Sequence, residues 1–317
     1  MGQAEGVRAP PTKEAPEDIK AEHEAFHKEL IEAVTQLFQR VSQGEGFNLK
    51  SLDALVARSL EAQGVLDFMY GKALALKDTT NAMGIHLVNV FTFSLKLGQG
   101  LRYSFERQRR LGTAALIHDL GMCRVPQEYR HKEGSLATRE LDEIRRHPIY
   151  GYELVLENLG NDYRWLAETL LQEHERERGQ GYPHGLAGDK IGEFAKVIGL
   201  ADVYEALSQP RPYRGQLLPY RVVQEILQNM RGFFSPKVLK AMLSELSVFA
   251  LHSLVRLNSN AIGQVVEIVA EHPLRPTIEL LYDAEGYRIR DRRVIHLKDS
   301  PLLYIVDSVD ESELPAD

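Results

Sequence analysis

Several ionisable side chains stand where an ordinary apolar helix would not place them. His118 and Asp119 end the apolar run TAALI, and Asp202 interrupts the apolar run VIGLADVYEAL. His147 stands at the end of a predicted helix, and His174 precedes a glycine-rich turn. Burying an ionised carboxylate is costly unless the charge is paired or bound to a metal ion. A buried metal site is therefore the chemistry that these residue types indicate.

The spacing of these residues is nearly regular. Asp119, His147, His174 and Asp202 follow one another at intervals of 28, 27 and 28 residues. Helical hairpins of that length would bring successive helix ends back to one place, and His86 lies upstream in a further apolar helix. Imidazoles and carboxylates that converge from separate helices suit Mn, Fe or Zn. These residues outnumber the three or four ligands that one metal needs, so a two-metal site is feasible. The alternative is that they are structural residues scattered over the fold.

The elements that must position these residues are predicted to be helices. Between residues 67 and 248 apolar residues recur at steps of three or four, as at Leu111, Ala114 and Ala115 before His118. Strand signals are scarce over this range. The sequence therefore predicts a helical domain that carries its candidate metal ligands close to helix ends.

The flanking segments differ from this central range. Residues 1–16 are rich in Pro, Gly, Ala and charge and predict a disordered tail, whereas residues 17–66 predict amphipathic N-terminal helices. Short β-rich runs separated by Gly and Pro predict a small antiparallel β domain over residues 249–310, and residues 311–317 predict an acidic tail. The expected fold class is mainly α, with a short N-terminal helical unit and a small C-terminal antiparallel β domain.

Composition limits the classes of function. With 317 residues, of which 44% are hydrophobic, the chain is long enough for one sizeable core and one small extra domain. Its net charge of -7 does not favour binding to DNA or to an anionic membrane, since both need a basic surface. Cys123 is the single cysteine, so no intramolecular disulfide is possible. The chain shows no signal-peptide core and no run near ~18 apolar residues, and a cytoplasmic location is expected.

The order of the motifs resembles that of the HD phosphohydrolase superfamily. His86, then His118 and Asp119, then Asp202 match its four-residue metal signature. The segments HDLG, HP, HERERGQGYP and ADVYEALSQPRPYR resemble the HD-GYP subfamily, whose name contains the tripeptide found here at residues 181–183. The resemblance covers roughly residues 75 to 235 and implies a helical HD-domain bundle.

The resemblance also implies an activity. Members of that family hydrolyse cyclic di-GMP to pGpG or GMP with two, sometimes three, iron or manganese ions. Carried over to this chain, His86, His118, Asp119 and Asp202 would form the core metal site, and Asp119 would be the catalytic residue that bridges two divalent metals. Two such cations can share a hydroxide, lower its pKa and direct it in line at phosphorus.

The remaining site residues follow from the same resemblance. His147 and His174 would hold the second metal, and Tyr182 would line the substrate pocket. Arg211 and Arg214 match the family's basic pair in RPYR, and guanidinium groups bind phosphate bidentately. The alternative for the two arginines is a solvated loop, and the alternative for Tyr182 is packing within the turn.

Four positions depart from the family's pattern. Met122 stands where the HDxGK motif has lysine, so a phosphate-binding cation is missing. Glu173 replaces the first histidine of HHExxDGxGYP; we count it as a metal ligand, and the alternative is a salt-bridged surface side chain. Arg178 replaces the aspartate of that motif and either restores a positive charge near the phosphates or marks a looser loop. Ala82 stands where trinuclear members have glutamate, which argues against a third metal.

Three functions stay open at this point. The first is a metal-dependent phosphodiesterase that acts on cyclic di-GMP. The second, suggested by Met122 and Glu173, is a catalytically degenerate receptor or adaptor for the same cyclic dinucleotide. The third is an HD hydrolase for another nucleotide or phosphoester, because the core metal signature serves many substrates. The N-terminal helices and the β-rich tail are candidate contacts for a homodimer and for a signalling-protein partner. The alternative for the N-terminal helices is that they pack as an extension of the main domain.

Overall fold

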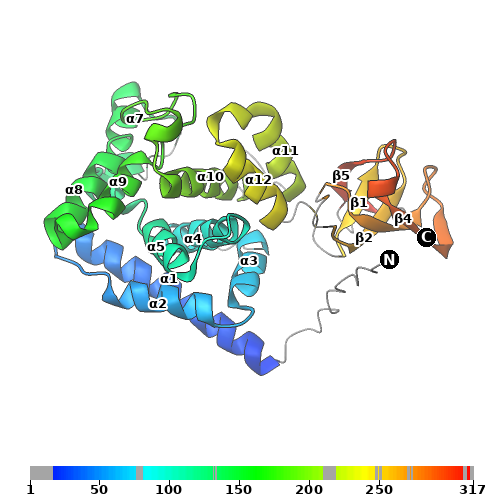
Figure 1. Ribbon diagram of the computed structural model, residues 1–317, viewed down its shortest axis with the longest axis horizontal. Helices are drawn as coiled ribbons and strands as arrows, with labels where there is room; N and C mark the ends of the chain where they lie inside the picture. The colour runs from blue at the N-terminus through cyan, green and yellow to red at the C-terminus, as the bar shows by residue number, and fades with distance from the viewer. Residues whose placement is uncertain are drawn as a thin grey trace, which may run out of the picture.

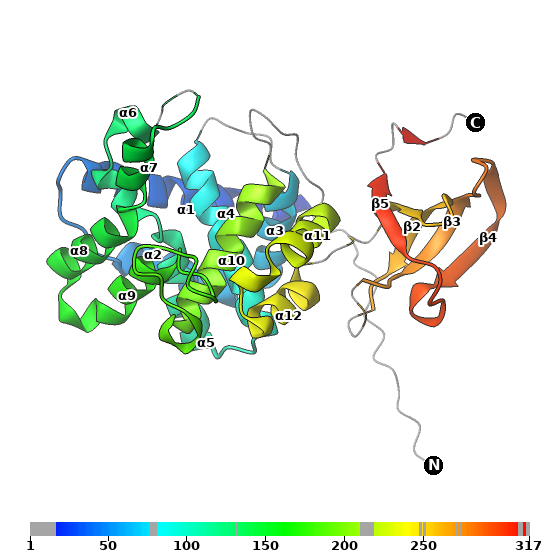
Figure 2. The ribbon, with the colours of Figure 1, turned by 90° about the horizontal axis from the view of Figure 1, so that it is seen from above.

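The structure of the protein is a computed structural model. It describes residues 17–75, 81–130, 132, 134–209, 219–246, 249, 252–269, 272, 274–309 and 313–314. These residues form a helical body followed by one antiparallel sheet, which lies to one side of the body next to α11 and α12 (Figure 1; Figure 2). The expected fold class, mainly α with a C-terminal antiparallel β unit, is confirmed.

The bounds of the elements are as follows. The helices are α1 (Glu17–Ser42), α2 (Lys50–Glu61), α3 (Val65–Ala75), α4 (Ala82–Gly100), α5 (Phe105–Leu116), α6 (Gln127–Arg130), α7 (Thr138–Ile144), α8 (His147–Leu159), α9 (Arg164–Gln172), α10 (Glu193–Ser208), α11 (Pro219–Asn229) and α12 (Pro236–Glu245). Short 3-10 turns are η1 (Leu120–Arg124), η2 (Asn161–Tyr163), η3 (Gly188–Lys190), η4 (Arg231–Phe233) and η5 (Leu297–Asp299). The strands are β1 (Leu254–Leu257), β2 (Ile262–Glu267), β3 (Thr277–Tyr282), β4 (Arg288–His296) and β5 (Ile305–Val309).

Local sequence signals fix where several helices begin. The side chain of Asn81 accepts a hydrogen bond from the Gly84 amide at 3.3 Å and caps α4. Ser104 and Ser235 cap α5 and α12 in the same way. Such caps satisfy backbone N–H groups that have no partner in the first helical turn. The start of each capped helix is thereby set within a residue or two.

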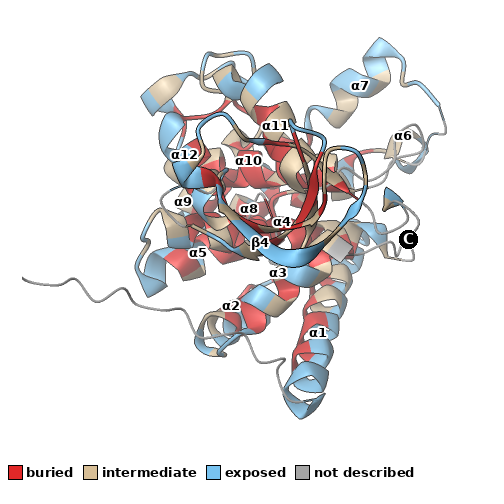
Figure 3. Ribbon diagram, turned by 90° about the vertical axis from the view of Figure 1, so that its right-hand side faces the viewer, coloured by how far each residue is buried: buried red, intermediate tan, exposed pale blue. Residues whose placement is uncertain are grey.

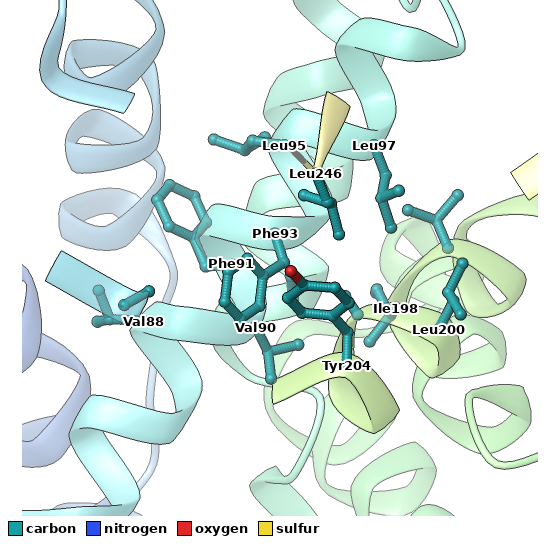
Figure 4. Packing of buried hydrophobic residues seen from close by; sticks show 14 of the residues in the cluster. Val88, Val90, Phe91, Phe93, Leu95, Leu97, Ile198, Leu200, Tyr204 and Leu246 are labelled. Carbon is teal, nitrogen blue, oxygen red and sulfur yellow. The ribbon is translucent and has the colours of Figure 1, made fainter. Parts of the chain in front are cut away.

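The core of the helical body is centred on α4 and α10. Both helices are apolar on nearly all sides, and their buried side chains pack against one another and against Leu246, which follows α12 (Figure 4). The rings of Phe93 and Tyr204 meet edge to face, with centroids 4.9 Å apart. Buried residues concentrate in these central helices, whereas β4 is exposed along most of its length (Figure 3). These two central helices also carry candidate ligands, His86 in α4 and Asp202 in α10.

The N-terminal helices belong to the same core as the central ones. Leu30 and Val34 of α1 are fully buried in the hydrophobic cluster that includes α4. The Asn81 side chain, which caps α4, also donates to Thr35 Oγ1 of α1 at 2.9 Å. The predicted limit at residue 66 lies inside α3. These helices therefore pack as an integral layer of the helical body.

The C-terminal sheet has the strand order β4-β3-β2-β1-β5, and all neighbouring pairs are antiparallel. It contacts the helical body through α11, where the Tyr220 hydroxyl donates to the backbone oxygen of Ile305 at 3.1 Å. Next to it, Arg221 pairs with Asp307 of β5 at 2.6 Å. Among the described residues, none of the helices has both the length and the apolar character needed to cross a bilayer.

Candidate metal centre

Helix ends and one mid-helix position bring the predicted ligands together. His86 lies in the second turn of α4, and His118 and Asp119 follow α5. His147 is the first residue of α8, and Asp202 lies within α10. Glu173 and His174 directly follow α9. The seven side chains come from segments up to 116 residues apart, and the fold makes them neighbours.

One group of these side chains comprises Asp119, His147, Glu173 and His174, whose ligand atoms all lie within 4.8 Å of one another. His147 Nε2 lies 3.3 Å from Asp119 Oδ1 and 3.4 Å from Glu173 Oε1. His174 Nε2 lies 3.0 Å from Glu173 Oε1 and 3.0 Å from His147 Nε2. Two carboxylates and two imidazoles thus point their ligand atoms at one small volume.

A second group comprises His86, His118 and Asp119, again within 4.8 Å. His86 Nε2 lies 3.6 Å from Asp119 Oδ2 and 3.6 Å from Asp202 Oδ1. His118 Nε2 lies 3.9 Å from the same Asp119 oxygen. Asp119 therefore turns Oδ1 toward the first group and Oδ2 toward the second.

Hydrogen bonds on the far side of the imidazole rings orient three of the histidines. His118 Nδ1 donates to the Ala115 backbone oxygen at 2.8 Å, and His147 Nδ1 donates to that of Ile144 at 2.8 Å. His86 Nδ1 donates to Glu205 Oε2 at 2.9 Å. A proton held at Nδ1 leaves the Nε2 lone pair free for a metal, and such outer partners are typical of ligating histidines.

The protonation states reflect the closeness of opposite charges. Burial alone would raise the pKa of Asp119, but His118, His86 and His147 outweigh it and hold that pKa well below its usual range. Burial alone would lower the pKa of His147, yet the bond to Glu173 and the charge of Asp119 raise it to about 9. The pKa of buried Glu173 is lowered by His174, His118 and His147. Both carboxylates are therefore anionic at neutral pH and suited to a cation.

Two buried polar atoms in the centre have no hydrogen-bond partner among the described residues. They are His118 Nε2 and Glu173 Oε2. Leaving such groups unsatisfied costs about 1–3 kcal/mol each, and a bound cation would satisfy both. The donor set of imidazoles and carboxylates also suits Mn, Fe or Zn. The residues present therefore fit divalent metal binding, and the burial of Glu173 excludes its alternative as a surface side chain.

The loop over residues 174–187 is held close to the centre by Glu175. This buried carboxylate accepts hydrogen bonds from the backbone amides of His184 at 2.7 Å and Leu186 at 2.8 Å. The Tyr182 ring stacks on His174 with centroids 4.7 Å apart, and the Arg145 guanidinium lies 5.6 Å from the Tyr182 ring centroid. Burial raises the pKa of Tyr182, as does Glu173, so the phenol stays neutral.

Of four further residues named in the sequence analysis, two belong to neither of these groups of ligands and two lie outside the described residues. Met122 lines a cavity together with His86. The Arg178 guanidinium lies against Gly232 of η4 and pairs with none of the candidate ligands in the part of the chain that is described. Arg211 and Arg214 lie outside the described residues.

Sequence reasoning missed Glu205 and Asn89, which support His86. Glu205 is buried, and its second oxygen accepts from the Asn89 side chain at 3.2 Å. The signal for Glu205 was present, since it follows Asp202 by three residues and so shares its helix face. Asn89 stands in the same relation to His86.

The chain is similar to known families and to named phosphodiesterases. A family model described as HD domain matches residues 72–238, and one described as KOW domain associated with HD domain matches residues 254–317. The chain is 27% identical over 285 residues to cyclic di-GMP phosphodiesterase PA4108 of Pseudomonas aeruginosa, covering 87% of this chain and 67% of that protein. It is 23% identical to 3'3'-cGAMP-specific phosphodiesterase 2 of Vibrio cholerae, covering 71% of this chain and 42% of that protein.

A solved structure shares the fold. Bd1817, an HDG"Y"P protein from Bdellovibrio bacteriovorus, superposes with a TM-score of 0.57 at 17% identity, over 74% of this chain and 73% of that one. The chain spans about two thirds of the length of the Pseudomonas aeruginosa phosphodiesterase and about two fifths of the length of the Vibrio cholerae one.

Proposed function

Because the chain belongs to the HD-domain family, we propose that it is a metal-dependent phosphodiesterase that hydrolyses cyclic di-GMP to pGpG or GMP. The observation that carries this proposal is the position of Asp119, whose two carboxylate oxygens face two separate groups of ligands. Supporting it, both a cyclic di-GMP and a 3'3'-cGAMP phosphodiesterase are similar to this chain over most of its length.

In this proposal the protein would hold two divalent ions, iron or manganese, with Asp119 common to both groups of ligands. His86, His118 and Asp202 would complete one site, and His147, Glu173 and His174 would complete the other. When bound, such cations supply Lewis acidity and lower the pKa of water, which is the chemistry that phosphodiester cleavage requires.

The chain's own residues position these groups. Glu205 and the backbone oxygens of Ala115 and Ile144 keep the protons of three imidazoles at Nδ1, away from the reaction centre. Tyr182 stacks on His174 and presents a neutral hydroxyl beside it, which is able to donate a hydrogen bond to a phosphoryl oxygen.

The test is a product assay with the Mn(II)- or Fe(II)-loaded protein and cyclic di-GMP, resolved by chromatography. We expect pGpG or GMP to form, and we expect chelation or Asp119→Ala to abolish it. Arg139→Gln, on an exposed position of α7, is the control for handling and folding. Full activity in the Asp119→Ala protein would disprove the proposal.

A receptor without turnover is the second candidate, and Met122 favours it because this apolar residue lines the cavity beside His86. Metal-loaded protein that binds cyclic di-GMP in calorimetry, yet releases no product after long incubation, would select this function. Product formation from 3'3'-cGAMP but not from cyclic di-GMP would instead identify a different cyclic dinucleotide as the substrate.

A further inference from the structure

A cavity of about 710 Å³ adjoins the metal centre on the side of His86. It is lined by residues of α1, the first turns of α4, η1 and α6, and it is open to solvent on one side. Cavities of roughly 300–1,000 Å³ are typical of small-molecule sites. The residues that matter for its chemistry are Gln39, Gln43, Met83, Met122, Gln127 and Arg130.

Arg130 contributes a positive charge to this cavity. It is the last residue of α6, and its half-buried side chain forms no ion pair within the described part of the chain. Its Nε atom is buried and has no hydrogen-bond partner among the described residues. Arg124 of η1, by contrast, is paired with Glu153 at 2.8 Å and with Glu157 at 2.5 Å. An uncompensated guanidinium beside a metal centre is suited to bidentate contact with a phosphate.

The remaining walls combine apolar and amide groups. Met83 and Met122 offer thioether side chains, which pack well against the faces of aromatic rings. Gln39 and Gln43 of α1 and Gln127 of α6 offer amides that both donate and accept hydrogen bonds. Arg130 could bind an anion, the methionines could pack against a flat ring, and the glutamines could form hydrogen bonds with the polar edge of that ring. A nucleotide has all three features.

Helix α1 is fixed against the turn that carries His86. Thr35 Oγ1 accepts from Asn81, the residue that caps α4, at 2.9 Å. A side chain at Gly84 would collide with Thr35, so glycine allows the two helices to approach closely. The amides of α1 are therefore held at a set position relative to the metal centre.

We propose that this cavity is the subsite for the nucleotide half of the substrate that is not being cleaved. Arg130 binds the phosphate of that half, which is the one not being cleaved, and Gln39 and Gln43 face its base. The inference rests on the proposed phosphodiesterase function and deepens it, since it makes a dinucleotide with two phosphates the preferred substrate class.

The test compares Arg130→Met with Arg139→Met, which removes one charge from an exposed position of α7 that does not line the cavity. Binding is measured by calorimetry with the non-hydrolysable phosphorothioate analogue of cyclic di-GMP. Turnover is measured with cyclic di-GMP and with bis(4-nitrophenyl) phosphate, which has a single phosphate. We expect Arg130→Met to raise Kd and KM for the dinucleotides about tenfold or more. Metal content should stay at the wild-type level, and kcat/KM should fall more for the dinucleotide than for the aryl diester, whereas Arg139→Met should match the wild type with both substrates.

A second pair of variants keeps the test independent of folding. Gln39→Ala and Gln36→Ala both change an exposed position of α1, but only Gln39 lines the cavity. We expect Gln39→Ala to weaken binding of the analogue about threefold to tenfold, the cost of one hydrogen bond. Gln36→Ala should bind as the wild type does.

The outcomes separate the two proposals. If Arg130→Met and Gln39→Ala bind the analogue as tightly as the wild type, the subsite is disproved, even in an active enzyme. If the wild type lacks turnover but both variants lose binding, the subsite stands and the phosphodiesterase function falls. A wild-type protein that does not bind the analogue overturns the subsite.

Discussion

Glu205 Oε2 lies 2.9 Å from His86 Nδ1, and this contact ties a buried carboxylate of α10 to a candidate ligand of α4. Burial would lower the pKa of His86, but the bonds to Asp119 and Glu205 raise it well above its usual value. Glu205 thus fixes the tautomer and the ring orientation of His86 without facing the metal position itself. It is a positioning residue in this centre.

Replacing Glu205 should therefore weaken metal binding rather than the fold. We expect Glu205→Gln, which keeps the shape but removes the charge, to lower metal affinity about 10- to 100-fold, as is usual for outer partners of ligating histidines. Metal titration monitored by calorimetry measures this, with circular dichroism as the check on folding. A metal affinity equal to that of the wild type would show that Glu205 has no positioning role.

Glu173 should decide how many metals the chain holds. Its carboxylate touches His147 and His174 but is not part of the group around His86. We expect Glu173→Gln to reduce the bound metal from about two ions per chain to about one, because only one of the two groups loses an anionic ligand. Elemental analysis of the purified protein measures this number. Glu153→Gln, an exposed position on α8, is the control, and two ions in the Glu173→Gln protein would contradict the assignment.

The metal-free protein should lose stability as the pH rises. The pKa of His147 is raised to about 9, so the stability it contributes is fully present below its unfolded pKa of 6.5 and is lost as the pH passes about 9. His86 acts in the same direction. The contribution from His147 is on the order of 3 kcal/mol at most. The carboxylates Asp119 and Glu173 act oppositely, and their contribution is lost only in acid.

Thermal unfolding of chelated protein between pH 6.5 and pH 9.5 measures this effect. The Tm should fall over that range, and it should fall less in His147→Gln, which has no imidazole to titrate. Metal-loaded protein should show no such fall, because its ligands are already deprotonated. A chelated protein whose Tm is constant across the range would refute the charge arrangement described here.

Gly121 should be intolerant of any side chain. A Cβ at this position would collide with the backbone oxygen of His147 and with the amide of Gly151. We expect Gly121→Ala to lower the free energy of unfolding by about 1–3 kcal/mol and to reduce the metal content, since α8 would have to move. Gly71→Ala is the matched control, because a Cβ there meets no atom within 4 Å. Denaturant unfolding of both variants measures the two free energies of unfolding. Equal values for Gly121→Ala and Gly71→Ala would contradict the prediction.

The candidate metal ligands could be predicted where a polar residue interrupts an apolar run. His118 with Asp119 and the isolated Asp202 were visible as polar residues within apolar runs, and the nearly equal spacing predicted that helix ends would meet. The texture change near residue 250 predicted the β unit, whose five strands the structure contains. The strand order was beyond prediction, because it depends on pairing between runs that look alike.

What sequence reasoning missed depends on tertiary position. Arg130 looks like any surface arginine in the sequence, and only the return of α6 toward α1 places it in a cavity beside His86. The N-terminal helices lie outside the motif-bearing range, so their place as a cavity wall had no signal. Glu205 had a signal, its spacing of three from Asp202, but a glutamate on a helix is usually solvated, so this spacing alone does not single it out.

The integral packing of α1 sets a limit on how this protein can be divided. The HD-domain family model begins at residue 72 and ends at residue 238, yet Leu30, Val34 and Leu37 of α1 complete the same hydrophobic core as α4. An expression fragment trimmed to the similar region would expose that face of α4 to water and would lose one wall of the cavity. The stretch matched by the HD-domain model is therefore shorter than the body that packs around one core, and biochemical work on this protein should begin no later than Glu17.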